Sequence, residues 1–226
     1  MSILIYRDPK SVGACAATLL ASHILRDPSC TIGVDYHENL LPVYDSLSAM
    51  TENGLLNWSE THVFQLFEFL ADETKEQRIA NLLGKALFAK TEISDAQYRV
   101  PFSAIEHAAE AADAYEKSIT DAGGLDAALI AVRQDGSLLM NRGTDADPFT
   151  HPETEDGNGF ITVGLSAIMQ TKHPIIVAIG GSCAQSVRTM LKGNLTESPL
   201  SALKLHAGAT FILDEEAGEM LLHSDN

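Results

Sequence analysis

The stretch from residue 160 to residue 214 constrains the fold most. Its apolar run 174–179 contains four β-branched residues among six, and it is too short for a core helix. A run of this kind predicts a strand that is buried on both faces of a parallel sheet. Gly180, Gly181 and Ser182 follow, and the next segment places apolar residues on one helical face (Cys183, Val187, Met190 and Leu191).

A buried strand, a glycine turn and a helix N-terminus together direct backbone N–H groups toward one point. In α/β proteins such a point commonly holds a phosphate or another anion. We therefore interpret Gly180, Gly181 and Ser182 as candidate ligand-binding residues. An ordinary strand-to-helix turn would have the same sequence, so this feature alone leaves both interpretations open.

Short apolar runs alternate with helix-forming segments along the whole chain. The patterns predict strands at 2–7, 30–36, 61–70, 98–100, 125–132, 160–162, 174–179 and 209–213. They predict helices at 9–25, 37–50, 73–90, 103–122, 183–193 and 201–206, an acidic helix at the C-terminus, and a polar loop at 142–159. This alternation favours an α/β fold with a largely parallel sheet covered on both faces. Because there is no repeat or linker, we expect one domain over residues 1–226.

The formal net charge of −16 argues against nucleic acid or anionic membranes as partners, because both require clustered Lys and Arg. The sequence contains no apolar run near the roughly 20 residues of a membrane span, and its N-terminus has no secretory pattern. We therefore expect a cytoplasmic protein. Its three widely spaced cysteines match no disulfide framework or metal motif, and we predict no metal and no cofactor.

Three segments carry a resemblance to a known family. They are AYEKSITDAGGLDAALIAVRQDG, FITVGLSAIMQTKHPIIVAIGG and SPLSALKLHAGATFILDEEA. In order and spacing they resemble the glucosamine-6-phosphate deaminase and 6-phosphogluconolactonase superfamily over nearly the whole chain. The resemblance implies a three-layer, doubly wound α/β sandwich. It also implies chemistry on sugar phosphates, either isomerisation with deamination of a hexosamine phosphate or hydrolysis of a lactone.

Several positions depart from the motifs of that family. Its first phosphate loop, similar to S-G-G-T-P, aligns with a segment in which His37 and Glu38 replace the two glycines and Asn39 follows. A carboxylate there repels a phosphate by on the order of 1 kcal/mol. The "D-E" pair that supplies the deaminase base aligns with Phe67 and Glu68. Glu68 would replace that base only if the strand slipped by one residue; otherwise it is a solvated or structurally paired carboxylate.

The family segment G-x-D-G-H-x-x-x-N-E aligns with Arg133 to Arg142. Asp135 matches, but Ser137 replaces the ring-opening histidine and Arg142 replaces the glutamate that orients it. Serine cannot act as an acid–base near neutral pH. Asp135 alone is more typical of a turn than of a catalyst. The lid segment is about half the family length, and Cys183 replaces the phosphate-binding lysine.

These departures support a family fold with an altered site, which binds a sugar or sugar phosphate with little or no family catalysis. We expect Asn39, His37, Ser137, Arg142 and the turn 180–182 to line that site. Arg142 is the cation that we expect to meet an anion there.

Two alternatives remain open. One is an active isomerase or deaminase with a rebuilt site, in which Asp135, Glu68 and His37 act. The other is a regulatory or structural subunit that pairs with an active homologue or with itself as a homo-oligomer.

Overall fold

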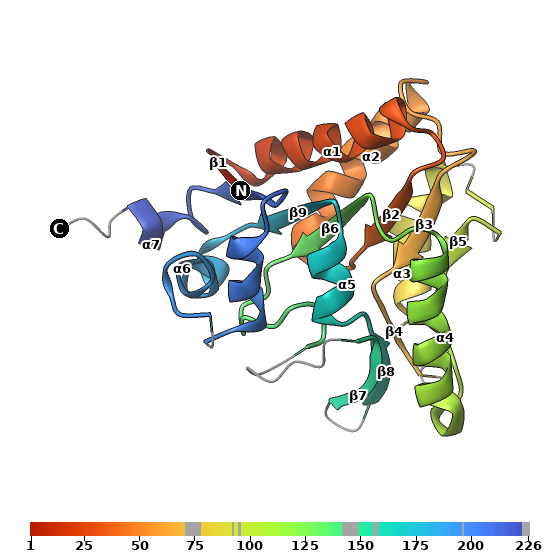
Figure 1. Ribbon diagram of the computed structural model, residues 1–226. Coiled ribbons are helices and arrows are strands. Elements are labelled where there is room, and N and C mark those ends of the chain that lie inside the picture. The colour runs from red at the N-terminus through yellow and green to blue at the C-terminus, as the bar shows by residue number, and fades with distance from the viewer. Residues whose placement is uncertain are drawn as a thin grey trace.

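The computed structural model describes residues 1–70, 78–91, 93–94, 96–141, 149–155, 158–195 and 197–222. Its main sheet has seven strands, all parallel, in the order β1-β10-β9-β6-β2-β3-β5 (Figure 1). Their bounds are β1 (Ser2–Tyr6), β2 (Thr31–Val34), β3 (His62–Gln65), β5 (Tyr98–Arg99), β6 (Ala127–Ala131), β9 (His173–Ala178) and β10 (Thr210–Asp214). The expected parallel sheet is confirmed.

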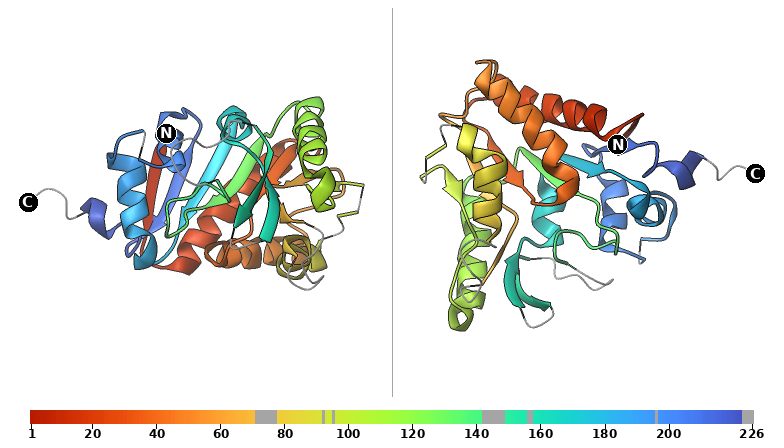
Figure 2. Two further views of the ribbon diagram at one scale, coloured as in Figure 1. Left: turned by 90° about the horizontal axis from the view of Figure 1, so that it is seen from below. Right: turned by 180° about the vertical axis from the view of Figure 1, so that it is seen from behind.

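Helices cover both faces of this sheet, as predicted (Figure 2). On one face a hydrophobic cluster packs against α1 (Pro9–Arg26), α2 (Leu41–Glu52) and α3 (Ile79–Ala86). On the other face a second cluster packs against α4 (Ala108–Asp121), α5 (Leu165–Gln170), α6 (Ala184–Lys192) and the 3-10 helix Pro199–Leu205. A short helix, α7 (Glu219–Leu222), follows β10. The structure is therefore a three-layer, doubly wound sandwich.

Local sequence accounts for the first helix and its close packing. The Asp8 side chain accepts the backbone N–H of Ser11, and Pro9 occupies the first helical turn, as the sequence predicts for a helix start. Gly13 on α1 lies against α2, where a Cβ atom would come within 2.5 Å of the carbonyl of Pro42. This close contact explains why glycine occupies an interior position of α1.

The predicted third strand, 61–70, belongs to two different sheets. Residues 62–65 form β3 in the main sheet, and β4 (Phe67–Phe69) pairs antiparallel with β8 (Asn158–Thr162) in a small sheet. β8 also pairs with β7 (His151–Glu155). The backbone changes sheets at Leu66, whose N–H donates to Val34 of β2 and whose carbonyl accepts the N–H of Val163. A single continuous strand was therefore a wrong prediction.

Other boundaries also differ from the predictions. The expected loop 142–159 contains β7 and the start of β8, because backbone pairing with β4 and β8 makes strands of polar residues. The helix predicted from residue 103 begins at Ala108 after a 3-10 turn at Ile105–His107, and the helix predicted at 201–206 is the 3-10 helix Pro199–Leu205. In the described residues, no helix is both long and apolar enough to cross a membrane.

Candidate functional site

The expected site residues follow neighbouring strands of the main sheet. His37 and Asn39 follow β2, Asp135 and Ser137 follow β6, and Gly180 follows β9. Because β9, β6 and β2 are parallel and lie side by side, their carboxyl ends are at one edge of the sheet. This edge is where open α/β folds bind ligands.

A buried ion pair lies between the ends of β2 and β6. Asp35 is completely buried, and its carboxylate accepts the backbone N–H of Ala131 at 3.0 Å. The two terminal nitrogens of Arg133 donate to the same carboxylate at 3.0 and 2.8 Å. The Arg133 side chain is 11% exposed, and its guanidinium carbon lies 5.5 Å from the centroid of the Phe67 ring. This two-pronged geometry directs the arginine charge at Asp35.

Arg133, Phe67 and Asp35 each occupy a position relevant to the family motifs. In the motif alignment, Arg133 matches the first glycine of the G-x-D-G segment, Phe67 matches the deaminase base, and Asp35 is the first residue of the segment aligned with the phosphate loop. Neither Asp35 nor Arg133 was predicted as a site residue from the sequence. Opposite charges just after two buried strands were the available signal, but only the strand order shows that these strands are neighbours.

Asn39 connects the loop after β2 with the turn before α6. Its side-chain amide donates to the Val132 carbonyl at 3.5 Å and to Cys183 Sγ at 3.3 Å. The Cys183 thiol donates to the same carbonyl at 3.3 Å, and burial raises its pKa, so the thiol stays protonated. Cys183, which replaces the family lysine, is therefore a neutral side chain that closes this junction.

His37 lies in the same loop, and its ring Nδ1 accepts the backbone N–H of Asn39 at 3.2 Å. Burial is the main reason why its pKa is lowered, and the Arg133 charge lowers it further. The imidazole is therefore neutral near pH 7. It contributes no positive charge toward an anion.

The glycine turn uses one of its N–H groups within the protein. The N–H of Gly180, at a φ of 86°, donates to both carboxylate oxygens of Asp214 at 3.0 and 2.9 Å. Asp214 is 2% exposed, and it stands at the end of β10. Gly181 and Ser182 are exposed and begin the 3-10 turn that leads into α6. A buried carboxylate beside this turn disfavours an additional anion.

Asp135 and Ser137 form a tight turn after β6. The Asp135 carboxylate accepts the backbone N–H of Ser137 at 3.0 Å and its hydroxyl at 2.7 Å. Gly136 between them has a φ of 76°, which glycine adopts without strain. This arrangement is the turn that the Asp-Gly pair predicts. The catalytic role of Asp135 stays a prediction.

Glu68 is completely buried and caps a helix. Its two carboxylate oxygens accept the backbone N–H groups of Ile79 and Ala80, at 3.0 and 2.9 Å, where α3 begins. They also accept the N–H of Phe69 at 2.8 Å and the Gln65 side-chain amide at 3.1 Å. These contacts support the structural interpretation of Glu68 rather than the catalytic one.

One expectation concerns a part of the chain beyond the described ranges. Arg142, the predicted anion-binding cation, lies outside the described residues. Within the ranges that are described, no group of three or more His, Cys, Asp or Glu side chains is arranged to hold a metal ion.

The strand order and the helices on both faces define a doubly wound α/β protein. A family model described as glucosamine-6-phosphate isomerases/6-phosphogluconolactonase matches residues 38–212. The chain therefore belongs to this family of carbohydrate metabolism.

Individual relatives agree with this assignment. Glucosamine-6-phosphate deaminase of Pseudarthrobacter chlorophenolicus is 30% identical over 246 residues, which cover 100% of this chain and 94% of the relative. The glucosamine-6-phosphate deaminase of Mycolicibacterium smegmatis is 26% identical over 242 residues, which cover 98% of this chain and 93% of the relative.

Solved structures show the same fold. A monomeric glucosamine-6-phosphate deaminase superimposes with a TM-score of 0.91 at 20% identity, covering 97% of this chain and 100% of that one. For 6-phosphogluconolactonase from Trypanosoma cruzi the TM-score is 0.79 at 20% identity, and the superposition covers 97% of this chain and 96% of that one.

Proposed function

We propose that this protein binds a sugar or sugar-phosphate metabolite at the carboxyl edge of the sheet, with little or no deaminase or lactonase catalysis. The main support is the contact of Arg133 with Asp35 and Phe67. By the motif alignment, Phe67 stands at the position of the deaminase base, and the Arg133–Asp35 ion pair lies beside its ring. Ser137, in the position of the ring-opening histidine, is bound to Asp135. Neither Phe67 nor Ser137 can transfer a proton near neutral pH.

The charges at this edge also bear on the ligand. Asp35 and Arg133 cancel each other, His37 is neutral near pH 7, and Asp214 is bound to the glycine turn. A phosphate group would therefore depend on a cation from elsewhere, and we propose that Arg142 supplies it. We expect the protein to act in the cytoplasm. Self-association or pairing with an active homologue stays a prediction.

Calorimetry and thermal shift test the proposal, with glucosamine-6-phosphate and hexose and pentose phosphates as ligands. Each sugar without its phosphate, and inorganic phosphate alone, are the matched controls. A ligand at a hundred times its dissociation constant should stabilise the fold by about 2.7 kcal/mol. Arg142→Ala should lower the affinity for phosphorylated ligands and leave the affinity for the unphosphorylated sugars unchanged. Arg188→Ala, which removes an exposed arginine from α6, serves as the charge-matched control.

A coupled assay for ammonia release from glucosamine-6-phosphate tests the catalytic part. We expect no turnover above the background rate. Turnover at the rate of an active deaminase would overturn the proposal and favour a rebuilt catalytic site. Failure of every sugar and sugar phosphate to bind would overturn the binding part.

A further inference from the structure

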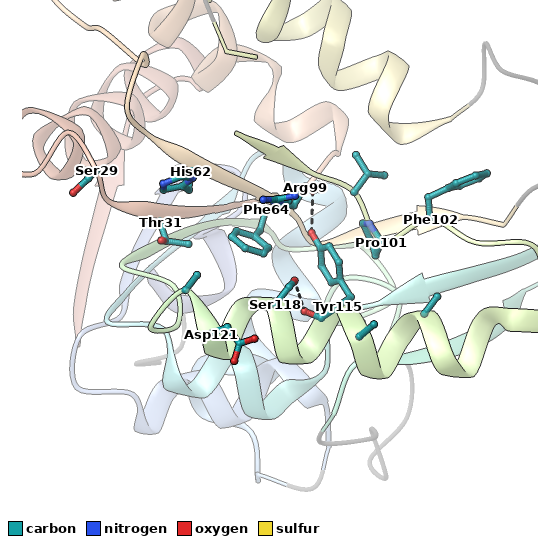
Figure 3. A pocket seen from close by; sticks show the side chains of 14 residues that line it. Ser29, Thr31, His62, Phe64, Arg99, Pro101, Phe102, Tyr115, Ser118 and Asp121 are labelled. Carbon is teal, nitrogen blue, oxygen red and sulfur yellow. Dashed lines mark hydrogen bonds between the residues drawn. The ribbon is translucent and has the colours of Figure 1, made fainter. Parts of the chain in front are cut away.

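A cavity of about 850 Å³ lies at the opposite end of the sheet from the family site. Its walls are the amino-terminal halves of β2 and β3, the segment after β5, and one side of α4 (Figure 3). The volume lies in the range of pockets that enclose small organic ligands. Thr31 lines this cavity at the first residue of β2, whereas Asp35 follows the last residue of the same strand. The cavity is therefore separate from the carboxyl edge.

The sheet wall combines an aromatic ring with two basic side chains. His62 and Phe64 are two residues apart on β3, so their side chains project from the same face of the sheet. Arg99 of β5 is in register with Phe64, which places it on that face as well. Strand geometry puts the Cα atoms of His62 and Arg99 roughly 8 Å apart. One anionic group can therefore contact both basic side chains, which are exposed.

Aromatic side chains form the apolar part of the cavity. The Phe64 and Tyr115 rings meet edge to face with centroids 5.8 Å apart between β3 and α4 (Figure 3). They are 3% and 7% exposed, so they form the base of the cavity. The Tyr115 hydroxyl lies 2.8 Å from the Gln65 carbonyl and 3.0 Å from that of Arg99. These bonds fix α4 against β3 and β5. The wall is therefore formed before any ligand arrives, which favours binding.

Helix α4 leaves room because it presents small side chains here. Ala111, Ala114 and Ser118 recur at intervals of three and four residues and line the cavity. Asp121 also lines it, but its carboxylate is paired with Lys117 one turn earlier on the helix. The acid is thus locally compensated. Arg99 supplies the positive charge of the cavity lining, and His62 adds a neighbouring ring N–H that can donate a hydrogen bond.

We propose that this cavity binds an aromatic phosphate of mononucleotide size. The ring would lie against Phe64 and Tyr115, and the phosphate would bind Arg99 and His62 at the rim. Arginine suits this role because its planar fork matches phosphate geometry. Because the chain has a net charge of −16, basic side chains are scarce on it. Two of them beside an aromatic wall therefore favour an anionic aromatic ligand at this cavity. The proposal is independent of the proposed sugar site.

Isothermal calorimetry with adenosine 5′-monophosphate tests this inference, with adenosine and inorganic phosphate as separate arms. We expect the nucleotide to bind at least tenfold more tightly than either fragment. Arg99→Ala should lower the affinity for the nucleotide at least tenfold and leave the affinity for adenosine nearly unchanged. Arg188→Ala, far from the cavity on α6, should leave both affinities unchanged.

Filling the cavity provides a second, uncharged test. Ala114 is exposed on α4, so Ala114→Phe should fold normally and should abolish binding of both the nucleotide and adenosine. If that variant does not fold, Ala111→Leu replaces it in the test, because Ala111 lines the same cavity, and the same loss of binding is expected. The inference is overturned if the nucleotide does not bind at millimolar concentration, or if either fragment binds as tightly as the nucleotide. It is also overturned if the Arg99 and Arg188 variants weaken binding equally.

Discussion

Replacing Arg133 with methionine measures how much the protein depends on its buried ion pair. Methionine keeps the apolar stem beside Phe67 but removes the guanidinium. The Asp35 carboxylate would then keep the Ala131 N–H and lose both arginine donors, while remaining completely buried. Breaking one side of a buried pair typically costs about 3–5 kcal/mol. For a domain of this size that loss corresponds to a decrease in Tm of roughly 6–20 °C.

Urea unfolding followed by circular dichroism gives the free energy of unfolding at pH 7. The control is Lys172→Met, because Lys172 pairs with Asp126 at the surface and its side chain is 63% exposed. Surface pairs contribute at most about 1 kcal/mol. The double variant Asp35→Asn/Arg133→Met should recover part of the loss, because it leaves no unpaired buried charge. If Arg133→Met costs no more than the surface control, our account of the pair is wrong.

Two further variants test other contacts of the candidate site. Glu68→Gln places an NH₂ group against the backbone N–H donors at the start of α3. The variant should lower the free energy of unfolding by about 1–3 kcal/mol, and amide hydrogen exchange in α3 should become faster. Unchanged stability together with weaker sugar binding would instead assign Glu68 to the ligand. For His37, a lowered pKa means that the unfolded chain binds a proton more readily, so stability should decline as the pH falls below about 6.5. His37→Asn should therefore lose less stability between pH 7 and pH 5 than the unaltered protein, as urea titrations at both values would show; an equal loss would contradict this assignment.

The parallel sheet was predictable because its strands carry their own signal. The runs at 125–132 and 174–179 are apolar without alternation, as strands buried on both faces require. The change of sheet at Leu66 was not predictable, because Phe67 and Phe69 continue the apolar pattern of β3. The β7–β8 hairpin was also missed, since its polar residues form strands through backbone pairing with a distant segment.

The candidate site was only partly predictable for a similar reason. Motif alignment identified the altered positions Phe67 and Ser137, because their motifs are local. It did not show that Arg133 neutralises Asp35, which lies 98 residues away in sequence. The capping role of Glu68 likewise depends on where α3 begins in space. Contacts between distant segments need the strand order, which a single sequence does not contain.

The order of strands also affects how the chain is made. β1 lies at the edge of the main sheet and pairs with β10, so Ser2 aligns with Thr210. A ribosome adds roughly 5–20 residues per second, so about 10–40 s separate the synthesis of these two strands. During that interval Ile3, Leu4 and Ile5 cannot join β10. The first strand to emerge is therefore among the last to be paired, and its apolar residues stay without their sheet partner until β10 has been made.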